Sequence, residues 1–365
     1  MIFNEFLENL ESYEPGKPIE LVAREYGIKP ENIIKVASNE NPFGSSPKAL
    51  QAIRASEPAL YPDDSYFALK HALAVRFGCE SANIIIGSGS DQVMEMAIKA
   101  VCNENRGILR AKTTFAMYDI YAKFAEAPVY KTQSEFHDLA QMAEIYTKNA
   151  ANIGAVILCL PNNPLGECPD ASEVYEFLEL ISQDTLVILD CAYMEFATFK
   201  DSKKHIKPAH VLSKFTNVLY SGTFSKAYGL GGMRVGYGLA NTKLIEQISK
   251  LRPPFNITTP SLAAAIAALD DEDFVQKGIK NNFDEMPRYE DFASEFGLKF
   301  IPSYTNLIAI FINEEKNSSI LAENLLKKGI ILRNLKSYGL NAVRITIGTK
   351  KQNDKVLEAL RAEFA

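Results

Sequence analysis

Two predicted strands, at residues 155–160 and 186–190, are apolar throughout except for the closing Asp190, and they constrain the fold more than any other feature of the chain. A strand with one face in water alternates apolar and polar residues, whereas a strand buried on both faces is apolar throughout. Other short apolar runs alternate with amphipathic stretches, as βα units require. We therefore predict an α/β fold with a mostly parallel central sheet flanked by helices.

The same pattern predicts a second, smaller α+β domain after Pro260. Further strands of the large sheet are expected at residues 83–86, 107–109, 217–220 and 234–239. Beyond them the pattern predicts a long charged helix over 271–296, strands at 299–301, 307–312, 330–333 and 343–347, and helices over 318–328 and 350–364. We expect an N-terminal arm (1–38) that packs with the small domain, a large domain (39–265) and the small C-terminal domain (266–365).

Composition excludes several classes of function. The net charge of -6 argues against a nucleic-acid partner, which would need a basic patch. No apolar run approaches the about 20 residues that cross a bilayer, and the N-terminus lacks the pattern of a secretory signal. The five cysteines form no CxxC pair, and the four histidines are never at metal-ligand spacing, so we expect neither disulfides nor a metal site. These features favour a location in the reducing cytoplasm.

Lys226 directly follows the hydroxyl residues Thr223 and Ser225, and Arg234 comes eight residues later. An amine can form an imine with an aldehyde, while hydroxyls and a guanidinium hold a phosphate. Pyridoxal phosphate carries both groups, and its enzymes need such a lysine together with an acidic partner for the ring nitrogen. The alternative is a loop of small residues with a solvated lysine.

Asp190 ends one of the two buried strands, at the edge of the sheet where open α/β proteins bind ligands. Opposite a pyridine nitrogen, this carboxylate would keep the nitrogen protonated. Tyr193 and Asn163 follow strands at the same edge and could both bind the ring oxygen. The alternative for Asp190 is a strand-ending or helix-capping residue.

The turn at residues 87–91 joins a predicted strand to a predicted helix. Its free N–H groups, with Ser90 and Asp91, would suit an anion, although the spacing fits neither a P-loop nor a dinucleotide-binding fingerprint. Tyr118 is predicted at the start of the next helix, where its ring could stack on a planar cofactor or belong to the core.

Arg344 opens an otherwise apolar strand, and Arg333 ends the strand before it. A guanidinium in such a strand must be paired or must face a ligand. Two convergent guanidiniums suit a doubly charged anion such as a phosphate, and one suits a carboxylate. A pair of structural salt bridges is the alternative.

Asn163, Asp190, Tyr193, Lys226 and Arg234 occur in the order and spacing of the fold-type I, class II pyridoxal-phosphate-dependent aminotransferases, which the chain resembles over nearly its whole length. Within this family the chain looks like the histidinol-phosphate aminotransferase subfamily. The segments that carry this closer resemblance are residues 13–18, 37–44, 61–63, 333–340 and the strand that begins at Arg344.

The resemblance implies a role for each matching residue. Lys226 would be the Schiff-base lysine and the base for the proton shift. The cofactor would be held by Ser90, Asp91, Tyr118, Asn163, Asp190, Tyr193, Thr223, Ser225 and Arg234, and by Tyr61 from the partner subunit of a homodimer. Tyr13, Asn39, Arg333 and Arg344 would bind the substrates, which are glutamate or 2-oxoglutarate and histidinol phosphate.

Three positions depart from the family's pattern. Leu165 stands where threonine is usual, Cys191 where glutamate commonly follows the aspartate, and Ala111 with Lys112 where prolines are usual. None of these changes removes a group that does chemistry. We expect the first two to alter packing around the ring, and so to bear on substrate choice.

Three other functions remain open at this point. An aromatic-amino-acid aminotransferase on the same scaffold would not need two anion-binding arginines. A decarboxylase of the phosphothreonine type would break the bond to the carboxylate instead of the bond to hydrogen. A regulatory module that binds pyridoxal phosphate would carry a DNA-binding domain, for which the chain has neither spare length nor a basic patch.

Overall fold

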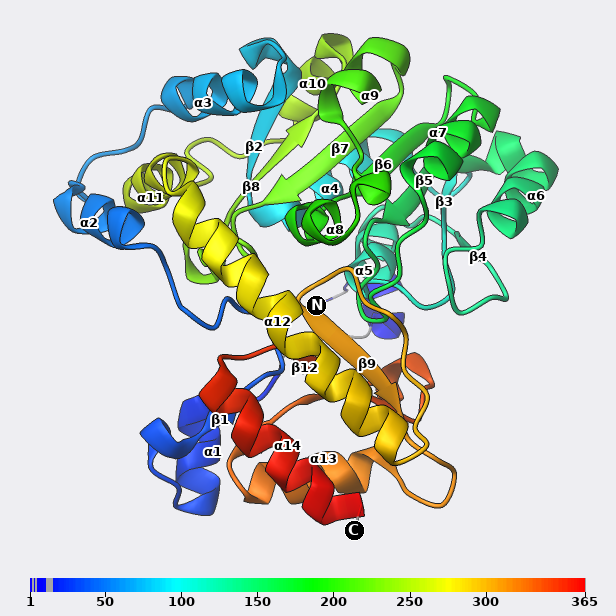
Figure 1. Cartoon of the computed structure of the whole chain (residues 1–365). Helices are drawn as coiled ribbons and strands as arrows, with labels where there is room; N and C mark the ends of the chain where they lie inside the picture. The colour runs from blue at the N-terminus through cyan, green and yellow to red at the C-terminus, as the bar shows by residue number, and fades with distance from the viewer. Residues whose placement is uncertain (2, 4, 11–15, 365) are drawn as a thin grey trace.

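The computed structural model describes residues 1, 3, 5–10 and 16–364. Two packed units lie one above the other in Figure 1, and the long helix α12 (Glu272–Glu295) runs from one to the other. The upper unit contains a seven-stranded sheet, and the lower unit contains two small sheets. The predicted domain boundaries at residues 38 and 265 stay predictions.

The seven-stranded sheet has the order β2-β8-β7-β6-β5-β3-β4. Its strands are β2 (Ile84–Ser88), β3 (Gly107–Arg110), β4 (Val129–Lys131), β5 (Ile153–Cys159), β6 (Leu186–Asp190), β7 (Val218–Thr223) and β8 (Val235–Leu239). Neighbours are parallel except that β8 is antiparallel to both β2 and β7. The sheet is therefore mostly parallel, as the apolar runs predicted.

The central strands of this sheet bury both of their faces, whereas the edge strand β4 is partly exposed. Val156 and Leu158 of β5 belong to one apolar cluster with helices α3, α7 and α11, whereas Ala155 and Ile157 belong to another with α4, α5 and α10. Because successive side chains of a strand point to opposite faces, a run buried on both sides cannot alternate with polar residues.

Helices surround the large sheet in Figure 1. They are α2 (Pro47–Ala55), α3 (Phe67–Phe77), α4 (Gly89–Val101), α5 (Met117–Phe124), α6 (Leu139–Asn149), α7 (Ala171–Leu180), α8 (Met194–Lys200), α9 (Pro208–Lys214), α10 (Thr242–Ser249) and α11 (Thr259–Leu269). Short 3-10 helices are found at Glu5–Asn9, Pro30–Asn32, Ser81–Asn83, Ala150–Asn152, Ser202–Lys204, Gly231–Met233 and Lys336–Tyr338.

The lower unit is built on the antiparallel sheet β11-β12-β9 and on a separate parallel pair, β1 with β10. Its remaining elements are β1 (Ile34–Lys35), β9 (Leu307–Phe311), β10 (Ile330–Ile331), β11 (Arg333–Asn334), β12 (Ala342–Thr346), α1 (Ile19–Tyr26), α13 (Ser318–Lys327) and α14 (Lys350–Phe364). The pairing of β1 with β10 brings the N-terminal part of the chain against the lower unit.

Two strand predictions for this unit were wrong. The segment 330–333 is not one strand, because its first half pairs with β1 and its second half pairs with β12. The segment 299–301 is not a strand either, since only Phe300 makes an isolated bridge, to Ile310. The partner of Ile330 and Ile331 is β1, near the other end of the chain, so a local pattern could not reveal that pairing.

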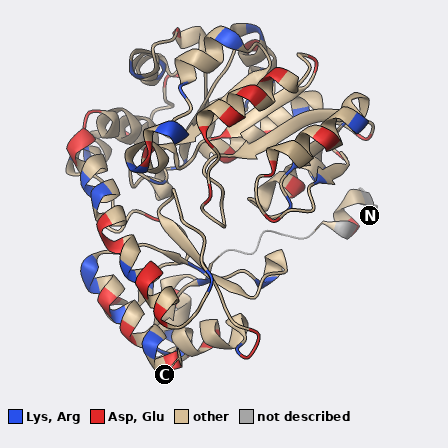
Figure 2. Cartoon of the chain, turned by 45° about the vertical axis from the view of Figure 1, so that its right-hand side comes forward, with Lys and Arg blue, Asp and Glu red and all other residues tan. Residues whose placement is uncertain are grey.

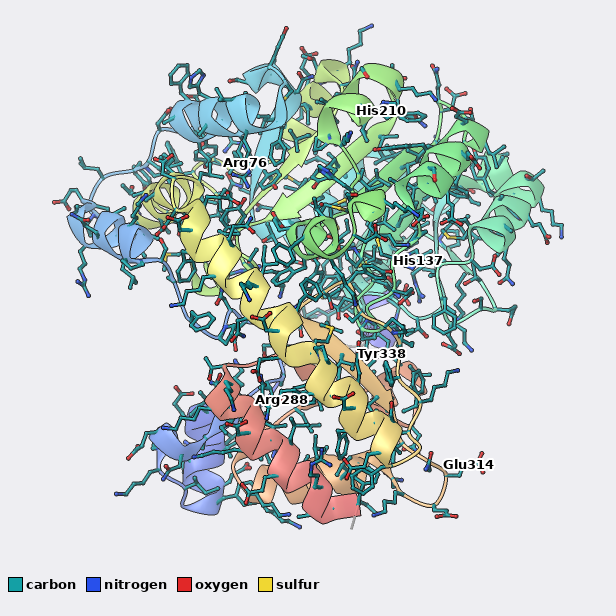
Figure 3. The ribbon with its side chains drawn as sticks, in the orientation of Figure 1. Arg76, His137, His210, Arg288, Glu314 and Tyr338 are labelled. Carbon is teal, nitrogen blue, oxygen red and sulfur yellow. The ribbon has the colours of Figure 1, made fainter. Side chains whose placement is uncertain are left out.

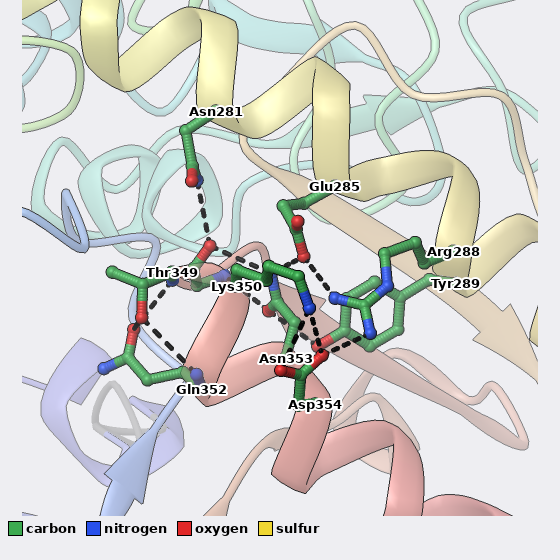
Figure 4. A network of polar contacts seen from close by, with 10 residues as sticks. Asn281, Glu285, Arg288, Tyr289, Thr349, Lys350, Gln352, Asn353 and Asp354 are labelled. Carbon is green, nitrogen blue, oxygen red and sulfur yellow. Dashed lines mark hydrogen bonds and ion pairs between the residues drawn. The ribbon is translucent and has the colours of Figure 1, made fainter.

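Polar contacts tie the joining helix α12 to the C-terminal helix α14 (Figure 4). Arg288 bonds Glu285 and Asp354, both at 2.5 Å, and Asn353 donates to Glu285 at 3.0 Å. The hydroxyl of Tyr289 donates to Asn353 at 2.9 Å in the buried part of this contact. Figure 2 shows acidic and basic residues mixed along these two helices. The lower half of α12 is thereby fastened to the lower unit.

Within the part of the chain that the structure describes, no helix combines the length and the apolar character needed to cross a membrane.

Candidate active site

The carboxyl ends of the central strands meet at one edge of the large sheet. Cys159 at the end of β5 lies opposite Asp190 at the end of β6, which in turn lies opposite Ser221 of β7. Strand β2 ends at this edge as well, since both β2 and β7 are antiparallel to β8. Ligands of open α/β proteins bind outside such an edge, and most of the predicted site residues follow these strand ends.

A polar cradle lies where β2 passes into α4. Arg234 donates to Asp91 Oδ2 at 3.0 Å and to Ser225 Oγ at 3.4 Å, and Thr223 Oγ1 donates to Ser225 Oγ at 3.0 Å. Gly89 has φ +77, and a Cβ atom there would lie 2.5 Å from the guanidinium of Arg234. Glycine therefore lets the guanidinium approach the N-terminus of α4, where free N–H groups favour anions.

Lys226 lies in the loop after β7. Burial, with the positive charges of Arg344 and Arg234 nearby, lowers the pKa of its amine to about 8. Its Nζ atom is 3.5 Å from the carbonyl oxygen of Ser38 and 5.7 Å from the ring centre of Tyr193. An amine with this pKa is partly neutral near pH 7, which is the form that acts as nucleophile or base.

Asp190 is 4% exposed, and burial raises the pKa of its carboxyl group to about 6. Two donors oppose this rise: the hydroxyl of Tyr118 donates to Oδ2 at 2.6 Å, and the N–H of Ala192 donates to Oδ1 at 3.2 Å. A cationic group that faces this buried carboxylate directly would stabilise its charged form.

The hydroxyl of Tyr193 and the side chain of Asn39 are fixed together. Asn39 Nδ2 donates to the Tyr193 oxygen at 2.7 Å, and Asn39 Oδ1 accepts from Thr346 at 3.1 Å. Burial raises the pKa of Tyr193. Because its oxygen already accepts a hydrogen bond and keeps its proton, the hydroxyl can donate to a ligand.

Arg344 and Asn163 join the two units. Arg344 donates through Nη1 to Asn163 Oδ1 and through Nη2 to the Ala37 carbonyl, both at 2.6 Å. With its oxygen occupied, the amide of Asn163 presents its nitrogen as a donor. In the small sheet, Arg333 lies directly opposite Arg344.

Two adjoining cavities bring these residues together. The first is lined by Ser90, Asp91, Phe115, Cys159, Asn163, Asp190, Ala192, Tyr193, Thr223, Ser225, Lys226 and Arg234. The second, of about 350 Å³, is lined by Gly16, Ala37, Ser38, Asn39, Asp91, Phe115, Met117, Tyr121, Asn163, Lys226, Arg333 and Arg344. Lys226 and Asn163 lie on both walls. A larger cavity of about 640 Å³, between α3, α8 and α12, has none of the described site candidates on its wall.

The position of Tyr118 corrects one prediction. Tyr118 is fully buried beneath Asp190 and lines neither cavity, so it cannot stack on a ring bound there. Phe115, three residues earlier, lines both cavities and packs edge-on against Tyr118. Helix α5 begins at Met117, so Tyr118 points from its first turn into the core, while Phe115 lies in the preceding turn.

One other described candidate, Tyr61, lines neither cavity. Tyr61 is 80% exposed and stacks on Phe255 at 4.6 Å between ring centres, so a role in a partner subunit stays a prediction. Tyr13 lies outside the described residues. Leu165 and Cys191 are buried but line neither cavity, contrary to the expectation that they pack around the ring.

Among the wall residues that the sequence did not single out, three have aromatic or thiol side chains. They are Phe115, Tyr121 and Cys159. Cys159 is the last residue of β5, so its place at the carboxyl edge was available as a signal. Tyr121 donates to Asp91 at 3.2 Å across the cavity wall, a contact between α5 and α4 that no local pattern announces.

The comparisons with known proteins agree over nearly the whole chain. Residues 31–360 match the family model "Aminotransferase class I and II". The chain is 60% identical to a histidinol-phosphate aminotransferase of Campylobacter concisus (strain 13826), over 99% of each protein. It is 54% identical to the enzyme of that name from Wolinella succinogenes, over 99% of this chain and 98% of the relative.

Solved structures show the same fold. The crystal structure of histidinol-phosphate aminotransferase from Sinorhizobium meliloti in complex with pyridoxal-5'-phosphate superposes with a TM-score of 0.86 at 26% identity, over 99% of this chain and 98% of that one. An aspartate aminotransferase of Thermus thermophilus gives a TM-score of 0.82 at 18% identity, over 99% of both chains. Given the match of the family model from residue 31 to residue 360, this chain belongs to the class I and II aminotransferases.

Proposed function

We propose that this chain is a pyridoxal-phosphate-dependent enzyme of histidine biosynthesis. It would transfer an amino group between L-histidinol phosphate and 2-oxoglutarate, giving imidazole-acetol phosphate and glutamate. One observation carries the proposal: Lys226 and Asn163 border both the cavity with the anion cradle and the cavity with two arginines. The names of the relatives at 54–60% identity support the same substrate.

The residues of the first cavity fit pyridoxal phosphate. Gly89 leaves the space that a Cβ atom would take from the guanidinium of Arg234, and the hydroxyls of Thr223 and Ser225 lie beside it. This cradle would hold the phosphate together with the N–H groups of Ser90 and Asp91. When bound, the cofactor supplies an aldehyde that reacts with amines and a ring that withdraws electrons.

Lys226 would anchor the cofactor and then carry a proton. Its pKa of about 8 leaves about a tenth of the amine neutral at pH 7. In the neutral form, Nζ can accept a proton from the substrate's α-carbon and return it to the neighbouring position. The two nearby guanidiniums help, because they disfavour the charged amine.

Asp190 would hold a proton on the ring nitrogen, since a buried carboxylate with a pKa near 6 is charged when a cation faces it. Tyr193 and the amide nitrogen of Asn163 would donate to the ring oxygen. Asn39 and Arg344 fix the directions of these two donors. Phe115 would pack against the ring, in place of the predicted Tyr118.

Arg344 would bind the carboxylate of glutamate, and Arg333 with Arg344 would bind the phosphate of histidinol phosphate. The two arginines lie opposite each other in the small sheet and line one cavity with Lys226. A shared guanidinium lets one pocket take two substrates whose anionic groups differ. Asn39 lines the same cavity, and Tyr13 would contribute beside it.

We further propose a cytoplasmic homodimer in which Tyr61 reaches the cofactor phosphate of the neighbouring subunit. Its exposed ring and its stacking on Phe255 support a contact with another chain. The five cysteines are all free, which suits a reducing compartment. Sedimentation equilibrium tests the oligomer, and the dissociation constant of pyridoxal phosphate in Tyr61→Ala tests the shared site.

Borohydride trapping tests the chemistry. Reduction of the protein with bound pyridoxal phosphate should fix the cofactor covalently to Lys226, which peptide mass mapping would locate. Lys226→Ala should lose the label and the turnover. Normal turnover by that variant would refute the mechanism.

Substrate competition tests the assignment. The kcat/KM for histidinol phosphate should exceed that for phenylalanine, and the reverse result would favour an aromatic-amino-acid aminotransferase. Release of carbon dioxide from phosphothreonine would favour the decarboxylase. One solved fold of that kind, from Porphyromonas gingivalis, superposes with a TM-score of 0.76 at 21% identity, which shows a shared fold alone.

A further inference from the structure

The loop at residues 161–167 leaves the large sheet after β5 and is held at its base. Its ends are closed by Asn162 N–H to the Glu167 carbonyl and by Gly166 N–H to the Asn162 carbonyl, each at 2.8 Å. The Asn162 side chain also donates to the Thr113 carbonyl at 2.9 Å and to the Glu167 carboxylate at 2.7 Å. These bonds give the loop a fixed shape within the upper unit.

The tip of this loop enters the lower unit. Leu165 is fully buried in an apolar cluster with Ile301, Ala309, Leu335 and Ala342. Among the described residues, Leu165 is the only member of this cluster that comes from the upper unit. Tyr338, which is labelled in Figure 3, packs against the rim of the cluster.

The cluster shares a face of the small sheet with the two arginines. Arg333 and Leu335 are two residues apart, as are Ala342 and Arg344, so each pair points to one side of the hairpin. Arg333 lies opposite Arg344, and Leu335 N–H donates to the Ala342 carbonyl at 2.9 Å. Leu165 therefore packs next to the guanidiniums, on the face that they use.

Other contacts of the loop reach the same unit. Asn163 accepts from Arg344 at 2.6 Å, and the Gly166 carbonyl accepts from Tyr304 N–H at 2.8 Å. A Cβ atom on Gly166 would lie 2.4 Å from Ser303 Oγ, so the backbones are in close contact here. Leucine at 165 adds an apolar anchor between these two polar contacts.

We propose that Leu165 is a positioning residue that seats the Arg333–Arg344 hairpin on the Asn163 loop, so that both guanidiniums face Lys226 before substrate binds. The proposal rests on the substrate roles given above to the two arginines. When a binding site is already assembled, no free energy of binding is spent on ordering its residues, so the affinity is higher. Without this side chain, substrate binding would have to draw the hairpin into place.

Leu165→Ala should therefore raise KM while chemistry is preserved. We expect KM for histidinol phosphate to rise about tenfold, which is the loss of affinity expected when one contact that positions the hairpin is weakened. The value of kcat and the dissociation constant of pyridoxal phosphate should change less than about twofold, because Lys226 and the phosphate cradle belong to the upper unit. Leu165→Met, which is flexible and of similar volume, should restore KM.

Leu325→Ala is the matched control. Leu325 is also a fully buried leucine of the lower unit, but it packs in a different cluster, with Leu321 and Ile330. It should lower the melting temperature as Leu165→Ala does, yet leave KM within about twofold of the parent. Should Leu165→Ala fail to fold, Leu165→Val gives the same comparison with a smaller expected rise.

Hydrogen exchange provides a measurement that is independent of activity. In the protein without substrate, the amide of Tyr304 should exchange faster in Leu165→Ala than in Leu325→Ala, because it bonds to Gly166 across the contact between the units. An unchanged KM in Leu165→Ala, or an equal rise in the control, would overturn the proposal. So would a fall in kcat alone.

Arg333→Ala separates this proposal from the proposed function. If that variant raises KM for histidinol phosphate and Leu165→Ala does not, only the positioning role is refuted. If the unmodified protein does not turn over histidinol phosphate, the proposed function fails first.

Discussion

Asp190→Asn should make the protein without cofactor more stable at neutral pH. Asp190 is held in the core beneath the first cavity, and burial raises the pKa of its carboxyl group from 3.8 to about 6. Asparagine has the same shape and carries no charge. Its Oδ1 can accept from Ala192, and its amide nitrogen can donate to the Tyr118 hydroxyl, so both present contacts have a replacement.

The size of the effect follows from the pKa. One pH unit corresponds to about 1.4 kcal/mol, so a charged Asp190 costs the folded protein about 3 kcal/mol at neutral pH. The folded state binds the proton more tightly than the unfolded state. The stabilisation that comes from protonation of Asp190 is therefore complete below the unfolded pKa of 3.8 and is lost as the pH rises through about 6. Asparagine at this position does not titrate.

Urea unfolding of both proteins, without cofactor, from about pH 4 to about pH 7.5 measures this difference. The free energy of unfolding of Asp190→Asn, minus that of the parent, should grow with pH by up to about 3 kcal/mol. Saturating pyridoxal phosphate should reverse the order, because a ligand stabilises only the protein that binds it well. A difference that stays constant over this pH range would refute the reasoning.

The remaining predictions concern contacts within the site. Tyr118→Phe removes a donor to a buried carboxylate, so titration of the apoprotein should show about a tenfold higher dissociation constant for pyridoxal phosphate; an unchanged constant would contradict this role. The rate at which Lys226 captures the cofactor, followed by stopped-flow absorbance, should rise about tenfold per pH unit below about 8 and level off above it. Arg344→Lys should lower kcat/KM for both substrates by about a hundredfold, since lysine cannot form a bidentate contact. Arg333→Ala should lower kcat/KM by a similar factor for histidinol phosphate alone. Equal losses for the two substrates in Arg333→Ala would argue against the phosphate role of Arg333. Gly89→Ala should weaken cofactor binding without changing the sheet, because its Cβ atom would displace the guanidinium beside it, and retained affinity would show that the cradle tolerates the shift.

Strand ends were predictable because the patterns that mark them are local. Asp190 closes an apolar run, and Lys226 follows another strand within a loop of small residues. The strand boundaries place both at one edge of the sheet, as the α/β pattern required. The direction in which a side chain points near the start of a helix depends on how the helix packs, which a local pattern does not reveal. For that reason Tyr118 was predicted to face the cofactor, whereas Phe115 lines the cavity.

Pairings between distant segments could not be read from the sequence. Residues 330–332 are apolar and Arg333 follows them without a turn signal, yet the predicted strand 330–333 divides between β1 and β12, because the N-terminal part of the chain pairs with its first half. Likewise, the sequence shows that Leu165 departs from the family's pattern, but only the structure shows that its side chain packs against the lower unit.

Local chemistry and periodicity thus determined the fold class and singled out Lys226, Asp190 and the residues that we propose hold the cofactor phosphate, since each lies near a strand end that a local pattern marks. The tertiary structure alone decided that Arg333 and Arg344 share a face with the Leu165 cluster and a cavity with Lys226. Such a pocket forms between two units, and contacts across about two hundred residues leave no periodic trace in the chain.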